Sequence, residues 1–518
     1  MRALAEHLLI APIALPLAAG GLMLLFEERR QTLKAFISLG AAALLFAAAL
    51  ALLERSDAPV THVYRLGNWP APFSIVLVAD RLSALMVVLA STLALAALAF
   101  SLARWHRASA HFHSLVQFLL AGLNGAFLTG DLFNLFVFFE LLLAASYGLA
   151  LHGSGTPRVR ASLHYIVVNL AASLLFLIGV SLMYGVTGTL NMADLAVRIP
   201  AVPEADRVLV EIGAAALGIA FLVKAGMWPL CFWLPATYAA ASAPAAALFS
   251  ILTKVGVYAV LRLWLLLFGG SDGAQLLVYG GMATLGFGVL GLLASQELPR
   301  MASFSLLVSS GTLIAAIGLG GADVTGAALY YLVVSTLGIG ALFLLIELLE
   351  RSRAPGADVL AVTAEAFGLV AEEPEPEEEV GIVIPATMAL LGFAFACSAL
   401  LIAGLPPLPG FVAKFALLAA LLHADPVPGV TWGMLALLLL SGLAAVIALG
   451  RAGVRIFWAS EEHSVPRVRM IEIVPVAALL TVCIGLTVLA GPAMRYMQDA
   501  AQALYAPRPY IDEVLSGP

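Results

Sequence analysis

Residues 131–152 read DLFNLFVFFELLLAASYGLALH, an almost unbroken apolar stretch with one carboxylate, Glu140, in its interior. As a helix rising about 1.5 Å per residue, this stretch would cross a hydrocarbon core of about 30 Å. Glu140 then lies roughly 13 Å into the span, near the membrane midplane. A charge at that depth costs at least about 2.5–3.5 kcal/mol on insertion scales, so Glu140 needs a partner, a proton or water. The alternative is a neutral glutamic acid that only hydrogen-bonds to a neighbouring helix.

The composition of the whole chain has the same character. Of 518 residues, 62% are hydrophobic and 11% are charged, and the mean hydropathy is +1.02. Such a chain is typical of a polytopic all-α membrane protein. The net charge of -6 argues against a nucleic-acid partner. Cys231, Cys397 and Cys483 lie in separate apolar segments with no CxxC pair, so we expect no metal site and no cofactor.

Fourteen apolar runs are long enough to span a membrane. They lie near residues 5–26, 34–53, 81–103, 110–130, 131–152, 163–185, 208–235, 243–268, 274–295, 303–322, 325–349, 383–422, 430–453 and 472–493. The first run is longer than the apolar core of a signal peptide, and we expect it to be a spanning helix that the mature protein keeps.

Two of these runs contain helix-breaking prolines. Run 208–235 contains Pro229, and run 383–422 is interrupted by GLPPLPG, which contains Pro406 and Pro407. A proline inside a helix removes a backbone hydrogen bond and kinks or breaks the helix. Broken helices are tolerated at membrane depth only where protein or water satisfies the freed groups, so we expect these two breaks to lie inside the protein.

The distribution of Lys and Arg predicts the topology. With the N-terminus outside, the inner loops carry 14 basic residues and the outer side 9, which favours both termini outside. The polar connections 54–79 and 186–207 then face outwards, and 351–382 faces the cytoplasm. The acidic run at 372–379 within this last connection is typical of a flexible linker, with docking to a partner as the alternative.

The chain has only four lysines, and three of them lie inside apolar runs: Lys224, Lys254 and Lys414. Lysine can lose its proton when it is desolvated, whereas arginine stays protonated. Three lysines at depth therefore indicate proton transfer more than structural snorkelling.

Small polar side chains recur beside these lysines at helical spacing. Ser250, Lys254 and Tyr258 share one face of a helix. Further stripes contain Ser305, Ser309 and Thr312, and then Tyr331 with Ser335. Such residues also occur simply as contacts between helices, but beside the lysines they are candidates for lining a hydrated path.

These segments also resemble a known family. The stretches DLFNLFVFFELLLAASYGL, KAGMWPLCFWLPATYAAASAPAAALFSILTKVGVYAVLR, MASFSLLVSSGT, GLPPLPGFVAKF and RAGVRIFWAS are similar to the D subunit of Mrp-type (Pha-type) monovalent cation/proton antiporters. That family is homologous to antiporter-like subunits of respiratory complex I. The resemblance implies about 14 transmembrane helices with two inverted five-helix repeats, each containing a discontinuous helix. The implied divisions are 1–109, a first repeat 110–268, a second repeat 269–455, and a last helix with a tail at 456–518.

The resemblance also implies roles for individual residues. Glu140 matches the family's glutamate on helix five, and Lys224 matches the lysine on broken helix seven that pairs with it. Lys254 and Lys414 match the lysines on helix eight and broken helix twelve, and the four imply a water-linked axis for protons. One position departs from the pattern, because Val334 stands where helix eleven usually carries a histidine. We therefore expect water with Ser309, Tyr331 or Ser335 to bridge Lys254 and Lys414, unless the relay is impaired.

The leading hypothesis is a transporter subunit, not an enzyme, in a bacterial inner membrane. It would move protons, coupled to export of Na⁺ or K⁺, together with the other subunits of a larger complex. Glu140 and Lys224 would form the input pair, Lys254 the relay and Lys414 the exit. The rival hypotheses are a proton-pumping subunit of a redox complex, such as NADH:quinone oxidoreductase or a membrane-bound hydrogenase, and a scaffold with an inactive channel.

Overall fold

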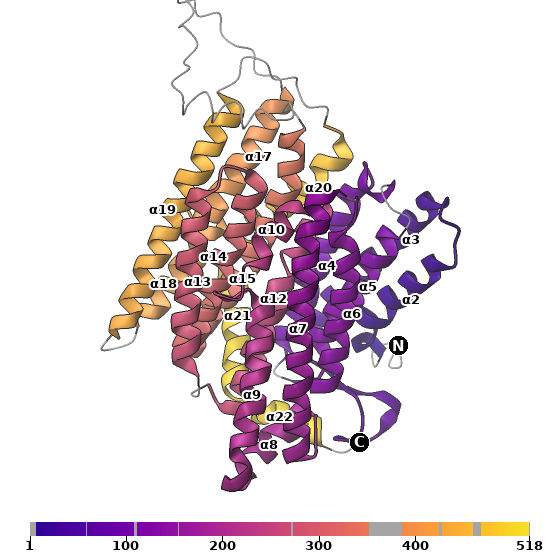
Figure 1. The fold of residues 1–518 in the computed structure, drawn as a ribbon, viewed down its shortest axis with the longest axis vertical. Helices are drawn as coiled ribbons and strands as arrows, with labels where there is room; N and C mark the ends of the chain where they lie inside the picture. Colours follow the sequence, from indigo (N-terminus) through magenta and orange to yellow (C-terminus); the bar gives the residue numbers. More distant parts are fainter. Residues whose placement is uncertain are drawn as a thin grey trace, which may run out of the picture.

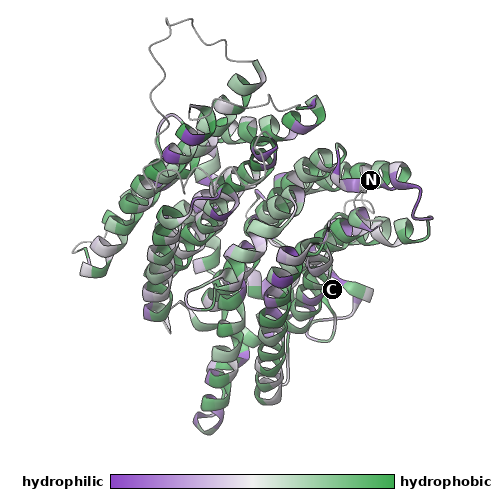
Figure 2. Cartoon of the chain, turned by 45° about the horizontal axis from the view of Figure 1, so that its top comes forward, coloured by the Kyte–Doolittle hydropathy of each residue, from purple (hydrophilic) through white to green (hydrophobic). Residues whose placement is uncertain are grey.

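The computed structural model describes residues 7–58, 60–107, 111–153, 155–270, 273–351, 386–423, 427–458 and 468–516. These residues form a bundle of long helices that run roughly along one direction, as Figure 1 shows. Hydrophobic residues dominate the helices (Figure 2), as expected of segments that face lipid or one another within a membrane. The predicted acidic run at 372–379 lies outside the described residues.

The described helices follow one another in this order. They are α2 (Ala11–Leu24), α3 (Gln31–Arg55), α4 (Arg81–Ser101), α5 (Phe112–Leu128), α6 (Leu132–Ala150), α7 (Thr156–Thr187), α8 (Met192–Arg198), α9 (Glu204–Ala225), α10 (Trp233–Ala240), α11 (Ala243–Phe249), α12 (Leu252–Phe268), α13 (Ala274–Ala294), α14 (Leu298–Leu319), α15 (Ala322–Glu350), α17 (Ala386–Ala403), α18 (Pro409–Leu422), α19 (Gly429–Phe457), α20 (Met470–Val488), α21 (Ala490–Tyr505) and α22 (Arg508–Leu515). Short 3₁₀ turns occur at η1 (His7–Leu9), η2 (Leu66–Asn68), η3 (Trp105–Arg107) and η4 (Ile199–Ala201).

The predicted all-α polytopic fold is confirmed. Within the described ranges, twelve helices are long and apolar enough to cross a membrane, counting α11 and α12 as one. The shorter apolar helices α2 and α5 bring the number of apolar segments to fourteen, because α18 continues α17 across a break. The division into two inverted repeats stays a prediction.

Both predicted helix breaks are present where the prolines indicated. Helix α9 ends at Ala225 and α10 begins at Trp233, with Pro229 between them. Helix α17 ends at Ala403 and α18 begins at Pro409, with Pro406 and Pro407 between them. Each first half-helix stops at a glycine with a left-handed backbone, Gly226 (φ 75°) and Gly404 (φ 77°). Other residues reach this conformation only with strain. The glycines therefore end the helices, and the prolines that follow prevent the helices from continuing.

A third discontinuity was not predicted. The run 243–268 forms α11 and α12, and the two are separated at Ser250 and Ile251, one turn before Lys254. Neither residue is a helix breaker, and both keep right-handed helical backbone angles. The distortion is therefore a local irregularity of one spanning helix, of the kind that often marks a functional position.

The centre of the bundle consists of α11–α12, α14 and α15. The most apolar stretches of these helices are 94%, 89% and 94% buried, compared with 33% for α3 and for α17. Helices α3 and α17 therefore present most of their surface to the surroundings, whereas neighbouring helices cover almost all of the surface of α12, α14 and α15.

One end of the bundle, here called the hairpin end, carries a small sheet. Strands β1 (His62–Arg65) and β2 (Val76–Ala79) pair antiparallel, with His62 opposite Ala79 and Arg65 opposite Val76. The short helices α8 and α22 lie at the same end in Figure 1. Arg65 donates hydrogen bonds to the main-chain carbonyls of Glu513, Val514 and Ser516 and so holds the end of α22.

The opposite end, here called the basic end, gathers most of the arginines that were assigned to inner loops. Arg451 and Arg455 donate to main-chain carbonyls of the α13–α14 connection, and Arg469 donates to Ala103 after α4. Arg351 after α15 pairs with Glu347 and Glu472. The positive charge at this end predicts that it faces the cytoplasm.

Close packing between α9 and α12 depends on Gly256. A Cβ atom at this position would lie 2.4 Å from the Ala225 amide nitrogen and 2.7 Å from the Phe221 carbonyl oxygen. Both atoms belong to the backbone and cannot rotate away. Although alanine is the better helix former, we expect Gly256→Ala to destabilise the fold by about 1–3 kcal/mol through overpacking.

The matched control is Gly286→Ala on α13, where an added Cβ meets no atom within 4 Å. The melting temperature of the purified protein in detergent should fall for Gly256→Ala and stay constant or rise slightly for Gly286→Ala. Equal melting temperatures for the two variants would contradict the close approach of α9 and α12.

Candidate functional site

Four ionisable side chains lie within the apolar bundle on four different helices. Glu140 is on α6, Lys224 near the end of α9, Lys254 on α12 and Lys414 on α18. The three lysines are 5%, 0% and 8% exposed. Their surroundings decide what each can do, because a buried ammonium is costly unless it has acceptors.

Glu140 and Lys224 lie near each other and interact electrostatically, but they do not form an ion pair within 4.0 Å among the described residues. The Lys224 ammonium nitrogen lies 5.0 Å from the centre of the Phe139 ring, a favourable cation–π contact. Both Glu140 Oε1 and Lys224 Nζ are buried and have no hydrogen-bond partner in the described part of the chain. Each therefore has hydrogen-bonding capacity left for water or for a transferred proton.

The helix break determines where Lys224 lies. Lys224 is in the last turn of α9, two residues before Gly226. The carbonyl groups at the C-terminal end of a helix carry partial negative charge and stabilise a nearby cation. The end of α9 at the break therefore stabilises part of the positive charge of Lys224, which apolar side chains could not do.

Lys254 is fully buried and has a direct hydrogen-bond partner. Its ammonium donates to Ser309 Oγ on α14 at 2.8 Å. Ser309 Oγ in turn lies 2.9 Å from Ser335 Oγ on α15. The hydroxyl of Tyr331, one turn earlier on α15, interacts with Ser309 and Thr312. A continuous set of polar groups therefore leads from Lys254 across α14 to α15.

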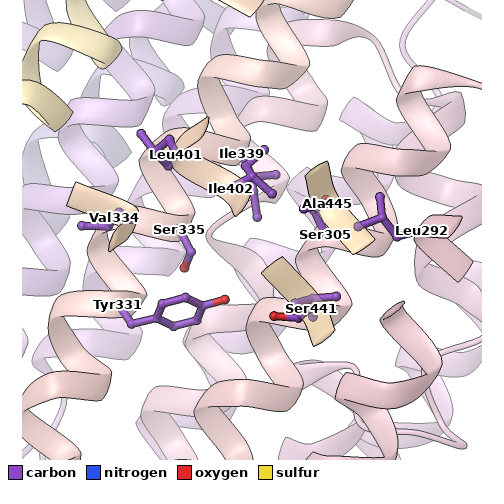
Figure 3. Close-up of a pocket in the computed structure, with 12 residues that line it drawn as sticks. Leu292, Ser305, Tyr331, Val334, Ser335, Ile339, Leu401, Ile402, Ser441 and Ala445 are labelled. Carbon is purple, nitrogen blue, oxygen red and sulfur yellow. The ribbon is translucent and has the colours of Figure 1, made fainter. Parts of the chain in front are cut away.

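A small cavity of about 20 Å³ begins where this set of groups ends. It is lined by Tyr331, Val334 and Ser335 from α15, by Ser305 from α14 and by Ser441 from α19, together with apolar side chains. Figure 3 shows the hydroxyls of Tyr331 and Ser441 pointing towards one another, with that of Ser335 close by. A cavity of 10–15 Å³ on this measure is enough for one water molecule if polar partners are present, and hydroxyl groups supply them here.

Lys414 lies on the far side of the cavity. Its ammonium donates to Ser441 Oγ at 3.2 Å and to the Ala403 carbonyl oxygen at 3.0 Å. Ala403 is the last residue of α17, so the second helix break provides a carbonyl acceptor for Lys414. The Lys414 side chain packs directly against Gly404, where an added Cβ atom would lie 2.5 Å from Lys414 Cδ. Glycine at this position leaves room for the Lys414 side chain.

The predicted polar residues divide into two groups. Ser305, Ser309, Tyr331 and Ser335 gather between Lys254 and Lys414. Ser250 and Tyr258 do not, although they share a helix face with Lys254. The Ser250 hydroxyl donates to the carbonyls of Ala247 and Thr336, and that of Tyr258 donates to the Phe127 carbonyl at 2.6 Å.

Ser441 was not predicted. It is an isolated hydroxyl in the apolar sequence LLLLSGLAAV, and no periodic pattern distinguishes it from a residue that only packs against a neighbouring helix. The adjacent Gly442 is the one local signal, because a Cβ there would lie 2.8 Å from the Ala403 carbonyl oxygen.

A second charged cluster lies at the hairpin end. Arg262, which the charge count assigned to the outer side, lies within α12 and forms a two-pronged ion pair with Asp80, the residue that caps α4. The ring of Tyr510 from α22 lies over the guanidinium. Burial opposes ionisation of Asp80, but the charge and hydrogen bonds of Arg262 outweigh it and lower the pKa of the carboxyl. The pair therefore stays charged.

Comparison with known proteins places the chain in a family. The family model described as "NADH:quinone oxidoreductase/Mrp antiporter, TM" matches residues 129–441, which include all four ionisable residues and Ser441. The D subunit of a probable K⁺/H⁺ antiporter from Rhizobium meliloti is 59% identical over 99% of this chain and 98% of its own length. The D subunit of a Na⁺/H⁺ antiporter from Alkalihalophilus pseudofirmus is 34% identical over 98% of this chain and 99% of its own.

Solved structures agree with this assignment. A chain in the Mrp complex from Dietzia sp. has a TM-score of 0.83 and 29% identity, covering 99% of this chain and all of that one. A chain of respiratory complex I from Thermus thermophilus, at 23% identity and a TM-score of 0.77, covers 98% of this chain and shares the fold. This chain belongs to the NADH:quinone oxidoreductase/Mrp antiporter family and, within it, to the D subunits of Mrp-type cation/proton antiporters.

Proposed function

We propose that this chain carries protons through a multisubunit Mrp-type antiporter that exports Na⁺ or K⁺. The names of the relatives support cation/proton antiport, and the assembly of the Dietzia chain within an Mrp complex supports other subunits as partners. The observation that carries the proposal is the polar connection from Lys254 through Ser309, Ser335, the cavity and Ser441 to Lys414.

The two lysines both donate towards the centre of this connection, Lys254 to Ser309 and Lys414 to Ser441. Because Lys254 donates to Ser309, the Ser309 proton is available to Ser335, and Ser335 donates into the cavity once its hydroxyl turns away from the Leu332 carbonyl. A water there would pass a proton to Ser441, whose hydroxyl must turn from the Leu438 carbonyl to reach a neutral Lys414. Each step breaks one O–H or N–H bond and forms another, so protons move while the heavy atoms stay in place.

In this proposal Glu140 and Lys224 form one end of the axis. A protonated Lys224 stabilises the Glu140 carboxylate across a gap too wide for a hydrogen bond, so the charge on one residue depends on the other. When a proton moves onto Lys254 and then towards Lys414, it changes the electrostatic interaction between Glu140 and Lys224. The remaining capacity of both groups for hydrogen bonds suits transient contacts with water.

Val334 takes no part in the transfer, since its side chain has no donor or acceptor. It lines the cavity and contributes to its apolar wall. The hydroxyls of Tyr331, Ser335 and Ser441 replace the single titratable ring that the family usually carries at this point. This supports a hydrated centre over two half-channels that work separately.

We further propose that the basic end faces the cytoplasm and that both termini lie outside. The rival function, a proton-pumping subunit of a redox complex, would use the same residues. The antiporter is favoured because the relatives at 59% and 34% identity are antiporter subunits. A list of the subunits that purify with this chain would decide between the two functions.

Glu140→Gln keeps the size of the side chain and removes its titration. We expect cation/proton exchange to fall by more than about tenfold, equivalent to roughly 1.4 kcal/mol on the barrier, while the complex still assembles. Exchange would be measured with a fluorescent pH probe in inside-out vesicles after addition of Na⁺ or K⁺. The control is Glu297→Gln, at an exposed position on the basic end, and exchange near the control level in the Glu140→Gln vesicles would refute the role of Glu140.

Lys414→Arg tests whether this residue releases its proton. Arginine keeps the positive charge but does not deprotonate, so we expect exchange to be lost over the whole pH range in which the native complex works. Arg300→Lys, an exposed change of the reverse kind, serves as the control. Full exchange by Lys414→Arg from neutral to alkaline pH would make Lys414 a fixed charge.

Ser309→Ala removes the hydroxyl that accepts from Lys254. We expect exchange to drop about tenfold, because the gap from Lys254 to Ser335 then lacks a bridging group. Ser303→Ala on the same helix is the matched control, since its hydroxyl donates only to the Pro299 carbonyl. Unchanged exchange in Ser309→Ala, or a large gain from Val334→His, would mean that the hydroxyl connection does not carry the protons.

A further inference from the structure

A pocket of about 360 Å³ opens at the hairpin end, beside the ion pair of Arg262 with Asp80. The ends of three spanning helices form part of its wall, with Ser56 directly after α3, Arg81 at the start of α4 and Arg262 six residues before the end of α12. Residues from the range 499–510 complete the wall. We call it the hairpin-end pocket. Because the ends of spanning helices meet there, it lies at the depth of the headgroups of a bilayer.

The ion pair in the wall of the hairpin-end pocket is already satisfied. Arg262 donates to both carboxylate oxygens of Asp80, and Asp80 also accepts from the Ser83 amide. The positive and the negative charge of this pair therefore match each other. The groups that can bind a ligand lie beside the pair.

Two donors in this wall have unused hydrogen-bonding capacity. Ser56 is 1% exposed, and its hydroxyl has no hydrogen-bond partner among the described residues. Arg81 donates from Nη2 to the main-chain carbonyl of Asp57, but its buried Nε is unpaired within the described ranges. A buried polar group without a partner is costly, so such groups are normally satisfied by water or a bound ligand. A guanidinium with a donor to spare, next to a hydroxyl, is well suited to bind a phosphate.

Two carboxylates next to Arg81 are only loosely paired with it. Asp57 Oδ1 lies 3.7 Å from Arg81 Nε, and Asp499 Oδ2 lies 3.8 Å from Arg81 Nη2. Both distances are longer than a hydrogen bond, and the two aspartate side chains are 65% and 49% exposed. The carboxylates can therefore accept hydrogen bonds from a cationic group of a ligand.

The two signs of charge lie side by side, which limits the class of ligand. Arg81 would repel a bare cation, and Asp57 and Asp499 would repel a purely anionic ligand. A zwitterion that carries a phosphate and an ammonium on a short linker can meet both demands. An ammonium with N–H groups can donate to Asp499, whereas a quaternary ammonium has no N–H to donate.

Apolar side chains share the wall with these charged groups. Leu266 and Leu504 line the pocket together with Val60, which is 51% exposed. Apolar surface at headgroup depth matches the part of a lipid that joins the headgroup to the acyl chains, whereas a free zwitterion gains nothing from it. A volume of this size is also within the range of about 300–1,000 Å³ that is typical of small-ligand sites.

We propose that the hairpin-end pocket binds the headgroup of a phosphatidylethanolamine lipid, with Arg81 and Ser56 on the phosphate and Asp499 on the ammonium. The lipid comes from the leaflet on the hairpin side. The proposal does not rest on the proton path, because none of these residues takes part in it. The bound headgroup would join the ends of α3 and α4 to α21, and so connect the first helices of the chain with the last ones.

The first test asks whether this lipid occupies the pocket. The purified complex is reconstituted in nanodiscs of phosphatidylglycerol that contain a small fraction of phosphatidylethanolamine with a photoreactive diazirine next to its glycerol. After irradiation, mass spectrometry should find cross-links within residues 56–61 and 499–510 of this chain. Absence of cross-links in both segments would overturn the proposal. Cross-links in the isolated chain but not in the complex would mean that another subunit fills the pocket, which would overturn it as well.

Competition with unlabelled molecules tests which chemistry the site recognises. Phosphatidylethanolamine should reduce the cross-linking severalfold more than phosphatidylcholine, which has the same phosphate but no N–H on its ammonium. Equal competition by phosphatidylcholine would overturn the contact between the ammonium and Asp499. Equal competition by water-soluble phosphoethanolamine would show that a free zwitterion occupies the site, and would overturn the lipid as its source.

The last test removes the proposed contacts one at a time. We expect Arg81→Gln and Ser56→Ala to reduce cross-linking severalfold with either lipid, because both residues bind the phosphate. Asp499→Asn should abolish the preference for phosphatidylethanolamine over phosphatidylcholine, which a general loss of stability would not do. The controls are Asp206→Asn and Arg207→Gln in the exposed first turn of α9, which should keep both the cross-linking and the preference. An unchanged preference in Asp499→Asn, or unchanged cross-linking in both Arg81→Gln and Ser56→Ala, would overturn the assignment.

Discussion

The constraint on which this structure depends is that an ammonium group within an apolar bundle needs acceptors that a continuous helix cannot offer. A regular helix uses its carbonyls internally, so only the ends of helices have some to spare. The two broken helices place such ends in the interior. Lys414 donates to Ala403 at the end of α17, and Lys224 lies in the last turn of α9. The prolines and glycines of the breaks are therefore part of the chemistry as well as of the fold.

Lys254 is stabilised in a different way, because its helix is only distorted and not broken. It depends on a side chain, Ser309, and on the neighbours that Ser309 contacts in turn. Hydroxyl groups can serve as both donor and acceptor, so they lower the cost of the buried ammonium and can pass its proton on. A histidine at position 334 would instead hold a proton for a time. In the proposed axis, serines and a cavity stand in its place, and none of these would hold a proton for long.

Much of the fold was predictable from the sequence, since the lengths of apolar runs and the positions of prolines are local properties. The four ionisable residues were predictable for the same reason, because a charge inside an apolar run stands out. Ser441 and the cavity were not predictable, because they depend on how α15, α17 and α19 pack against one another. The pairing of Arg262 with Asp80 was not predictable, because the two residues are 182 positions apart and no local pattern links them.

The cluster around Arg262 at the hairpin end has a consequence for the order in which the chain assembles. Arg262 is covered by Tyr510, and the helix that carries Tyr510 is anchored by Arg65 through carbonyls up to Ser516. An element from the first seventy residues, one from the middle and one from the last ten must therefore meet before this end is complete. A ribosome that makes the helices in order leaves the Arg262–Asp80 pair without the cover of Tyr510 until α22 has been made. Docking of α22, and not the insertion of any one span, is thus the event that closes this end.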